Sequence, residues 1–349
     1  MRHIQEIDTI DISRGLEGMT ELMIQDAKTL ADWSYIAISK HFKKILKHEA
    51  EVIQDKDPEE LHQMRVGMRR LRSACTGFSY ALNLPKAANE KNVGKVARIL
   101  GELRDIDVLE EALKQQYQPV LPKPEQKALN TALKILSDKR DKTFLKVKKI
   151  LQGDLYSNLK EAFQEWLDKP IYQDLGYLAI QTVLPDLLLP QVSHFLLHPA
   201  WLIGNNSIEL HKNWTPEEVE NLLHKQGYIV HNLRKEAKRT RYNMELFTEF
   251  YGESYQNYLQ DVKTIQSILG EIQDCFVLAD FLTDVFGKNL EDGIPTLLNK
   301  LQEIRYEKWN EWQDLRGKFL NPETRQEFHL TILASESKKL VETNGLTHV

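Results

Sequence analysis

The sequence predicts an all-α protein built from two similar helical halves. Apolar residues recur at helical spacing through most of the 349 residues, and strand-like alternation is scarce. One segment also repeats at a constant offset: His62 corresponds to His231 (231 − 62 = 169), and Leu100-Gly101-Glu102 corresponds to Leu269-Gly270-Glu271. The expected architecture is therefore two four-helix-bundle-like halves related by pseudo-twofold symmetry, with similar faces that can turn toward one another.

The composition is that of an ordinary globular protein whose positive charge is concentrated locally. Hydrophobic residues make up 42% and charged residues 28% of the chain, which is enough for a sizeable core, and the formal net charge is −5. The total charge therefore gives no sign of a polyanion-binding protein. However, the stretch from Leu61 to Asn89 contains Arg and Lys residues and no Asp or Glu, so we expect a local, focused positive potential.

The remaining totals predict a soluble cytoplasmic protein. Cys75 and Cys275 lie far apart and form no disulfide or metal-binding pattern, which favours a reducing compartment. The N-terminus lacks the apolar segment of a signal peptide. No run of residues approaches the roughly 18 apolar residues that a membrane span requires.

The first half is expected to follow an N-terminal extension at 1–25 and to occupy 26–168. Its first helix is expected over Leu30–Ile53. Asp57-Pro58-Glu59-Glu60 then supplies an N-cap, a first-turn proline and early acids for a helix that runs to about Leu82. Further helices are expected at 87–116, 125–150 and 154–168, and a hinge at Asp168–Gly176.

The second half, 177–343, is expected to begin with an apolar stretch and an irregular segment. Thr215-Pro216-Glu217-Glu218 then restarts a helix with a capping-box pattern. Gly227 occupies the position of Pro58 in the repeat (58 + 169 = 227), so we expect a break there and a separate helix that carries His231. Later helices are expected at 254–286, 294–319 and 322–343, before a tail at 344–349.

A stripe of positive charge lies beside the apolar seam of the duplicated helix. Apolar residues from Leu61 to Leu82 step by three and four, and the charged residues follow the same steps one position later. Such spacing puts the charges on one line along the helix. The first stripe consists of His62, Arg65, Arg69 and Arg72, with Arg70 beside it, and the second of His231, Arg234, Lys238 and Arg241, with Lys235, Arg239 and Tyr242 beside it.

These stripes favour an anion-binding site over an ordinary solvated face. Solvated helix faces mix charges of both signs, whereas the first stripe is entirely basic and the pattern occurs twice. Arginine offers a planar fork of donors to phosphate oxygens, and cations spaced by one helical turn suit a string of phosphates. Further cations are expected from Lys40, Lys44 and Lys47 on the first helix and from Arg98 and Arg104 on the third, although ordinary surface charge explains these five equally well.

Three interpretations are open for His62 and His231: a neutral core histidine, a metal ligand or a phosphate donor. A metal is the least compatible, because the neighbouring cations would repel a dication, and a phosphate donor fits better. Asp105 and Asp274 are expected to hold arginine side chains in position. The glycines of the repeated Leu-Gly-Glu motif are expected to allow close helix packing.

Two motifs in the chain resemble the signatures of the CHAD family, the conserved histidine α-helical domain. They are His62-x-x-Arg65-x-x-x-Arg69-Arg70-Leu71-Arg72 with Leu100-Gly101-Glu102-Leu103-Arg104-Asp105 downstream, and His231-x-Leu233-Arg234-Lys235-x-x-Lys238-Arg239-x-Arg241-Tyr242. The resemblance covers 26–343. It implies two helical bundles around a basic central cavity that binds inorganic polyphosphate through the two stripes. Gln273 and Phe276 replace Arg104 and Asp107 in the second half, whose downstream helix we therefore expect to contribute less.

The sequence thus predicts a non-catalytic protein that binds inorganic polyphosphate and uses no metal or cofactor. The sequence has no P-loop, no His-Glu-x-x-His motif and no credible nucleophile–base pair, so a metal-dependent phosphohydrolase acting on polyphosphate is a less favoured alternative. Binding of nucleic acid or of another phosphorylated polyanion is a second alternative. Bases would need an aromatic platform, and only Tyr242 lies beside the stripes. We expect no membrane association, and a cytoplasmic protein associated with polyphosphate granules.

Overall fold

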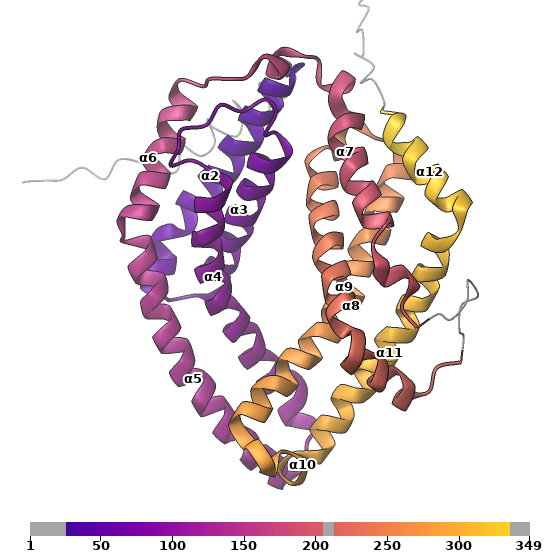
Figure 1. Cartoon of the computed structure of the whole chain (residues 1–349). Coiled ribbons are helices and arrows are strands. Elements are labelled where there is room, and N and C mark those ends of the chain that lie inside the picture. Colours follow the sequence, from indigo (N-terminus) through magenta and orange to yellow (C-terminus); the bar gives the residue numbers. More distant parts are fainter. Residues whose placement is uncertain (1–25, 205–212, 336–349) are drawn as a thin grey trace, which may run out of the picture. The chain divides into compact units, whose positions relative to one another are not determined.

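The computed structural model describes residues 26–204 and 213–335, and it confirms the all-α fold class (Figure 1). Within these ranges every regular element is a helix, and the β-type pairings are isolated bridges, Thr29 with Ala179 and Leu82 with Tyr172. The expected N-terminal extension and C-terminal tail lie outside the described residues.

The chain forms two compact units. Unit 1 comprises Met1–Val120 and Leu129–Ile180, and unit 2 comprises Leu121–Ala128 and Gln181–Val349. Each unit therefore contains one copy of the duplicated basic helix. The pseudo-twofold relation of the two halves and the basic central cavity stay predictions.

A buried glutamate explains why the start of α5 (Lys123–Leu151) belongs to unit 2. Glu125 is 5% exposed and accepts hydrogen bonds from the backbone N–H groups of Thr296 and Leu297, both at 3.1 Å. These groups lie in the first turn of α11 (Pro295–Leu320), whose own N-cap residue makes no side-chain bond. Unsatisfied N–H groups at a helix start need such a partner.

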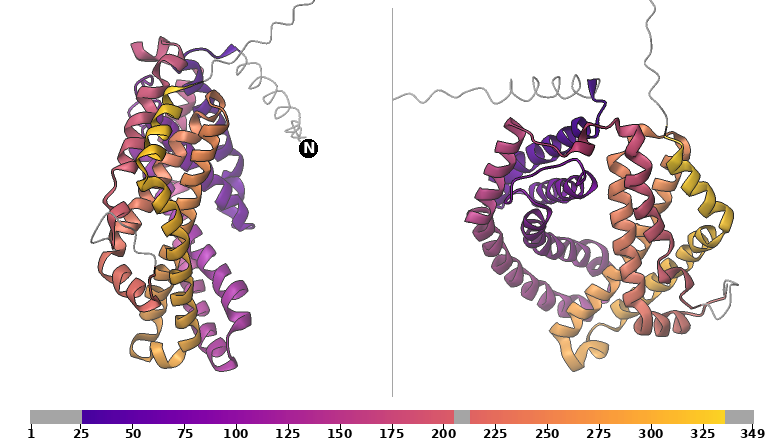
Figure 2. Two further views of the ribbon diagram at one scale, coloured as in Figure 1. Left: turned by 90° about the vertical axis from the view of Figure 1, so that its right-hand side faces the viewer. Right: turned by 45° about the horizontal axis from the view of Figure 1, so that its top comes forward.

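In unit 1 the basic helix α3 (Pro58–Gly77) packs between α2 (Leu30–Gln54) and α4 (Glu90–Glu111), as both figures show (Figure 1, Figure 2). The predicted apolar seam of α3 is buried, with Met64 and Met68 at most 1% exposed. The other regular elements described in unit 1 are the π-helix Ala112–Tyr117, the 3-10 helix Gln118–Val120, α5, α6 (Asp154–Asp168) and the 3-10 helix Asp174–Tyr177.

The start of α3 is confirmed, but its predicted end is wrong. The Asp57 side chain accepts the Glu59 amide, and Pro58 occupies the first turn. The helix ends at Gly77 rather than near Leu82, because the chain turns there and the Leu82 amide bonds back to the Phe78 carbonyl.

In unit 2 the basic helix α8 (Pro216–Leu246) packs against α9 (Glu253–Phe286) and α11. Trp309 and Trp312 of α11 are fully buried in an aromatic core. The other regular elements described in unit 2 are α7 (Ile180–Leu196), α10 (Leu290–Gly293), α12 (Pro322–Leu333) and the 3-10 helices Pro199–Leu202, Thr248–Phe250 and Gly287–Asn289.

Two boundaries predicted in unit 2 are wrong. α8 runs without a break through Gly227, because the capping box of Thr215 and Glu218 starts a single helix and one interior glycine costs only about 1 kcal/mol. α12 ends at Leu333, since Ala334 leaves the helical conformation with φ −93° and ψ 54°. The rest of the helix predicted to residue 343 lies mostly outside the described residues.

Candidate anion-binding faces on α3 and α8

The α3 face is the surface made by His62, Arg65, Arg69 and Arg72 together with the α4 residues that they approach. The Arg65 side chain lies over Gly101 of α4: a Cβ atom there would stand 3.4 Å from Arg65 Nε. Asp105, one turn further along α4, accepts a hydrogen bond from Arg65 Nη2 at 3.3 Å, which confirms its predicted contact. Gly101 therefore leaves room for a guanidinium, whereas the sequence predicts close helix packing at this position.

The same arrangement recurs at the other end of the α3 face. Arg72 lies over Gly94, where a Cβ atom would stand 3.3 Å from its Nε, and Arg72 also pairs with Glu90. Gly94, Arg98 and Gly101 follow one another on α4 in steps of four and three, and so share one line along the helix. Arg98 is exposed on that line, between the two arginine contacts.

The cations of this face also act on His62. Its pKa lies below 6.5 because it is partly buried and because Arg104, Arg69 and Arg65 disfavour its protonated form, an effect that Glu59 opposes. Arg104 is therefore close enough to act together with the stripe. Histidine in its neutral form can still donate one ring N–H to an anion.

Arg70 belongs to a different group of cations, on the α2 side of α3. Burial, Arg70, Lys40 and Lys44 together lower the pKa of His41 to about 3. The pKa of Lys44 is lowered as well, by burial and by the charges of Arg70, Lys47 and Lys40. The structure therefore brings Arg70 together with the three α2 lysines. His41 is not among the residues predicted for the site, although it precedes Lys44 by three positions and so shares its helix face.

The α8 face, made by His231, Arg234, Lys238 and Arg241, repeats the central feature of the α3 face. Arg234 lies over Gly270 of α9, where a Cβ atom would stand 3.5 Å from Arg234 Nε. The repeat offset relates this pair to Arg65 and Gly101 (65 + 169 = 234; 101 + 169 = 270). Arg234 Nε is buried and has no hydrogen-bond partner among the described residues.

His231 at the start of the α8 face resembles His62 in its environment. Burial, Lys235 and Arg234 lower its pKa, while a hydrogen bond with Gln273 opposes them. Its Nδ1 atom is buried and lacks a hydrogen-bond partner in the described part of the chain. Lys235 is exposed one turn further along α8, and Lys238 is half-buried.

The remaining predicted residues of α8 are held in other ways. Arg241 Nε donates to Glu245 at 2.9 Å, and its guanidinium lies 5.5 Å from the centre of the Tyr242 ring. Tyr242 is only 7% exposed, so it supports Arg241 and offers no open stacking platform. Arg239 pairs with Glu236 at 3.0 Å, and Glu236 also accepts a bond from Gln191 of α7, which sets Arg239 apart from the stripe.

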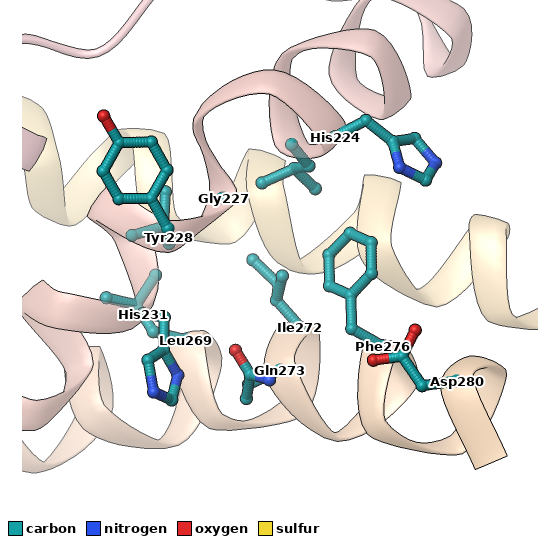
Figure 3. Close-up of a pocket in the computed structure, with 11 residues that line it drawn as sticks. His224, Gly227, Tyr228, His231, Leu269, Ile272, Gln273, Phe276 and Asp280 are labelled. Carbon is teal, nitrogen blue, oxygen red and sulfur yellow. The ribbon is translucent and has the colours of Figure 1, made fainter.

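A pocket of about 310 Å³ opens between α8 and α9, next to His231 (Figure 3). His231 and Gln273 lie at one end of it, and Phe276 and Asp280 lie at the other. The residue pattern of α8 and α9 does not predict this pocket. Gly227 lines the pocket, and a Cβ atom there would meet nothing within 4 Å.

A family model described as the CHAD domain matches residues 36–283 of the chain. The chain belongs to the CHAD family. The crystal structure of the CHAD domain from the plant Ricinus communis shares 21% identity, covers 88% of this chain and 93% of that chain, and has a TM-score of 0.53. PptA from Streptomyces chartreusis shares 13% identity over 86% of this chain and 100% of that chain, with a TM-score of 0.56. These structures show the shared fold. A search of curated proteins found no match.

In this CHAD chain, no described group of three or more His, Cys, Asp or Glu side chains is arranged to hold a metal ion. Cys75 and Cys275 are free and buried, and burial raises their thiol pKa to about 12 and about 11. Among the helices of residues 26–204 and 213–335, none is both long and apolar enough to cross a membrane.

Proposed function

We propose that this CHAD protein binds inorganic polyphosphate through the α3 face and the α8 face, without catalysing a reaction. The observation that carries the proposal is the repeated arrangement of an arginine lying over a helix glycine, Arg65 over Gly101 and Arg234 over Gly270. Each of these arginines belongs to a row of cations on its own helix.

The way in which these arginines are held leaves donors for an anion. Arg65 donates to Asp105 at 3.3 Å, and the Asp105 side chain is 72% exposed, so solvent screens the pair. Arg234 Nε lacks a partner within the described residues. Phosphate oxygens accept bonds from guanidinium groups in bidentate geometry, and successive helical turns repeat the cations every ~5 Å. A linear chain of phosphates matches such a row.

Two further observations support a non-catalytic polyphosphate-binding protein. Tyr242, the aromatic residue beside the cations of the α8 face, is buried, so it cannot stack successive bases of a single-stranded nucleic acid. The carboxylates beside the last cation of each stripe, Glu90 and Glu245, are paired with Arg72 and Arg241 and so serve as partners of arginines. A cytoplasmic location and association with polyphosphate granules are part of the same proposal.

The test removes two cations from one face at a time. Arg65→Ala with Arg69→Ala, and Arg234→Ala with Lys238→Ala, are each expected to weaken polyphosphate binding about a hundredfold or more, because a charge-assisted contact contributes about 1.5–3 kcal/mol. Lys139→Ala with Lys142→Ala removes the same charge from exposed positions of α5 outside both faces. This control is expected to change the affinity by less than about threefold.

Isothermal calorimetry at several salt concentrations supplies the affinity and the stoichiometry. The slope of log K against log salt should approach −0.7 to −0.9 per phosphate neutralised, as for other polyanions. Equal losses in the control and in the two face variants would contradict the proposal, and so would stronger competition by single-stranded DNA or RNA than by polyphosphate. Shortening of polyphosphate by purified protein with Mg²⁺ on a gel would contradict the non-catalytic part.

A further inference from the structure

The pocket between α8 and α9 continues the line of the α8 face. His224, Gly227 or Tyr228, His231 and Arg234 or Lys235 follow one another along α8 in helical steps, so the pocket begins where the cations end. The close-up shows α8 on one side of the pocket and α9 on the other (Figure 3). A ligand bound by the phosphate-binding cations would therefore have this pocket directly beside it.

Gly227 has no packing or conformational reason to be glycine. It lies inside a continuous helix, its φ is not positive, and a Cβ atom would meet no other atom within 4 Å. An interior glycine costs about 1 kcal/mol relative to alanine. What the missing side chain provides is open space at the wall of the pocket.

The equivalent place in unit 1 is filled with charge. The repeat offset relates Gln273 to Arg104 and Phe276 to Asp107 (104 + 169 = 273; 107 + 169 = 276). In unit 1 Asp107 is buried and accepts a hydrogen bond from Arg140 at 2.7 Å. In unit 2 these charges are replaced by an amide and an aromatic ring, which suit a flat, largely apolar group better than a further phosphate.

Two neighbouring side chains contact the aromatic wall of the pocket, the ring of Phe276. The Arg305 guanidinium lies 4.8 Å from the centre of the Phe276 ring, and Arg305 itself makes two bonds to Glu220 at 2.9 and 2.6 Å. The His224 ring meets Phe276 edge-on at 5.9 Å. A preorganised ring of this kind recognises a flat partner without a cost for ordering the side chain.

We propose that this pocket receives the base of a nucleoside polyphosphate whose phosphates lie on His231, Arg234 and Lys235, an inference that rests on the proposed phosphate binding by the α8 face. Its volume of about 310 Å³ falls at the lower end of small-molecule sites. Leu223, Val230 and Ile272 supply apolar lining, while Gln273 and Asp280 supply hydrogen-bonding groups for the edge of a base or a ribose. The cations bind the phosphate chain, and the pocket adds selectivity for its organic end.

The test compares ATP with inorganic tripolyphosphate and with adenosine by calorimetry on the full chain. ATP is expected to bind about tenfold more tightly than tripolyphosphate, because base stacking adds to the phosphate contacts, and adenosine alone is expected to bind weakly. Gly227→Leu fills the pocket and should make ATP and tripolyphosphate equal while long-chain polyphosphate binds as before. Gly293→Leu is the matched control, since a Cβ atom there also meets nothing within 4 Å, and it should keep the preference for ATP.

The outcomes separate this inference from the proposed function. Equal binding of ATP and tripolyphosphate by the unmodified chain, with polyphosphate bound, would overturn the pocket proposal alone. A preference for ATP without polyphosphate binding would overturn the proposed function and keep the pocket. If Gly227→Leu fails to fold, Phe276→Leu replaces it: this variant keeps an apolar wall without an aromatic ring, and an unchanged preference for ATP would refute the proposal.

Discussion

The α3 face and the α8 face share the placement of one arginine, Arg65 or Arg234. They differ in the ion-pair partner of the arginine at the C-terminal end of the face. Arg65 and Arg234 both lie over a glycine of the neighbouring helix. Arg72 is paired with Glu90 of α4, whereas its equivalent Arg241 is paired with Glu245 of the same helix, four residues on. The arrangement of arginine over glycine is therefore the common element of the two faces, and the carboxylates around it vary.

The buried charges beside the two faces differ as well. In unit 1 Arg140 joins Asp107 to Asp55, with Nη atoms 2.7 and 2.8 Å from the Asp55 oxygens. In unit 2 Arg305 pairs with Glu220 and lies against an aromatic ring. In unit 1 an ion network therefore fills this region, whereas in unit 2 the equivalent region borders a pocket.

The opposite sides of the two basic helices show a third difference. At Gly67 a Cβ atom would stand 2.9 Å from Ile45 Cγ1, so α2 and α3 are in close contact. The equivalent position of α8 is Glu236 (67 + 169 = 236), which meets α7 through Gln191. The duplicated helix therefore keeps its cationic side, while its other side adapts to a different neighbour.

The largest expected effect comes from removing the guanidinium of Arg140 or of Arg305 from its ion pairs. Arg140→Met should lower the free energy of unfolding by about 4 kcal/mol, because it removes the partner of the buried Asp107 and of the half-buried Asp55. Arg305→Met should lower it by about 3 kcal/mol, because it removes the buried guanidinium that pairs with the half-buried Glu220. Urea unfolding, followed by hydrogen exchange in the helices of each unit, measures both losses. Lys139→Met, at an exposed position of α5, is the control, and losses as small as in that variant would contradict the role of the networks.

A smaller effect is expected on the pH dependence of stability, which should differ between the two units. His41 is 8% exposed with a pKa of about 3, so the unfolded chain binds a proton that the folded chain rejects between about pH 6.5 and pH 3. Stability therefore falls as the pH falls through this window, by roughly 2–3 kcal/mol at pH 4.5. The described histidines of unit 2 are half-buried or exposed, so acid is expected to loosen unit 1 first.

His41→Leu isolates this contribution. The difference in unfolding free energy between pH 7.5 and pH 4.5 should shrink by the same roughly 2–3 kcal/mol in the variant. Hydrogen exchange in α2 and α3 should then respond to pH no more than exchange in α9 and α11. An unchanged pH dependence would show that His41 is not the group responsible.

The smallest effect on polyphosphate affinity is expected from the carboxylates that pair with Arg72 and Arg241. Glu90→Gln releases Arg72, and Glu245→Gln releases both Arg241 and Lys263, whose Nζ lies 3.7 Å from Glu245. Each change is expected to tighten polyphosphate binding about two- to fivefold, more for Glu245, because an exposed or half-exposed pair is worth up to ~1 kcal/mol. Glu165→Gln, exposed on α6, controls for net charge, and an equal gain there would rule out a specific effect.

The sequence alone determined the local features of this protein. The N-caps of α3 and α8, their apolar seams and the alignment of their cations all follow from residue spacing, because a helix side is set by its own 3.6-residue period. The constant offset of the duplication likewise makes Arg65 and Arg234 equivalent without reference to the tertiary structure. The family resemblance followed from the same residues.

Only the tertiary structure decided which partner each side chain meets. Spacing along α4 cannot show that Gly101 accommodates a guanidinium, nor spacing along α8 that Tyr242 is buried or that Gly227 borders a pocket. Glu125 caps a helix that begins 170 residues later (295 − 125 = 170). The physical reason is the same in each case: helical periodicity fixes the direction of a side chain within its own helix, while the packing of separate helices decides what lies there.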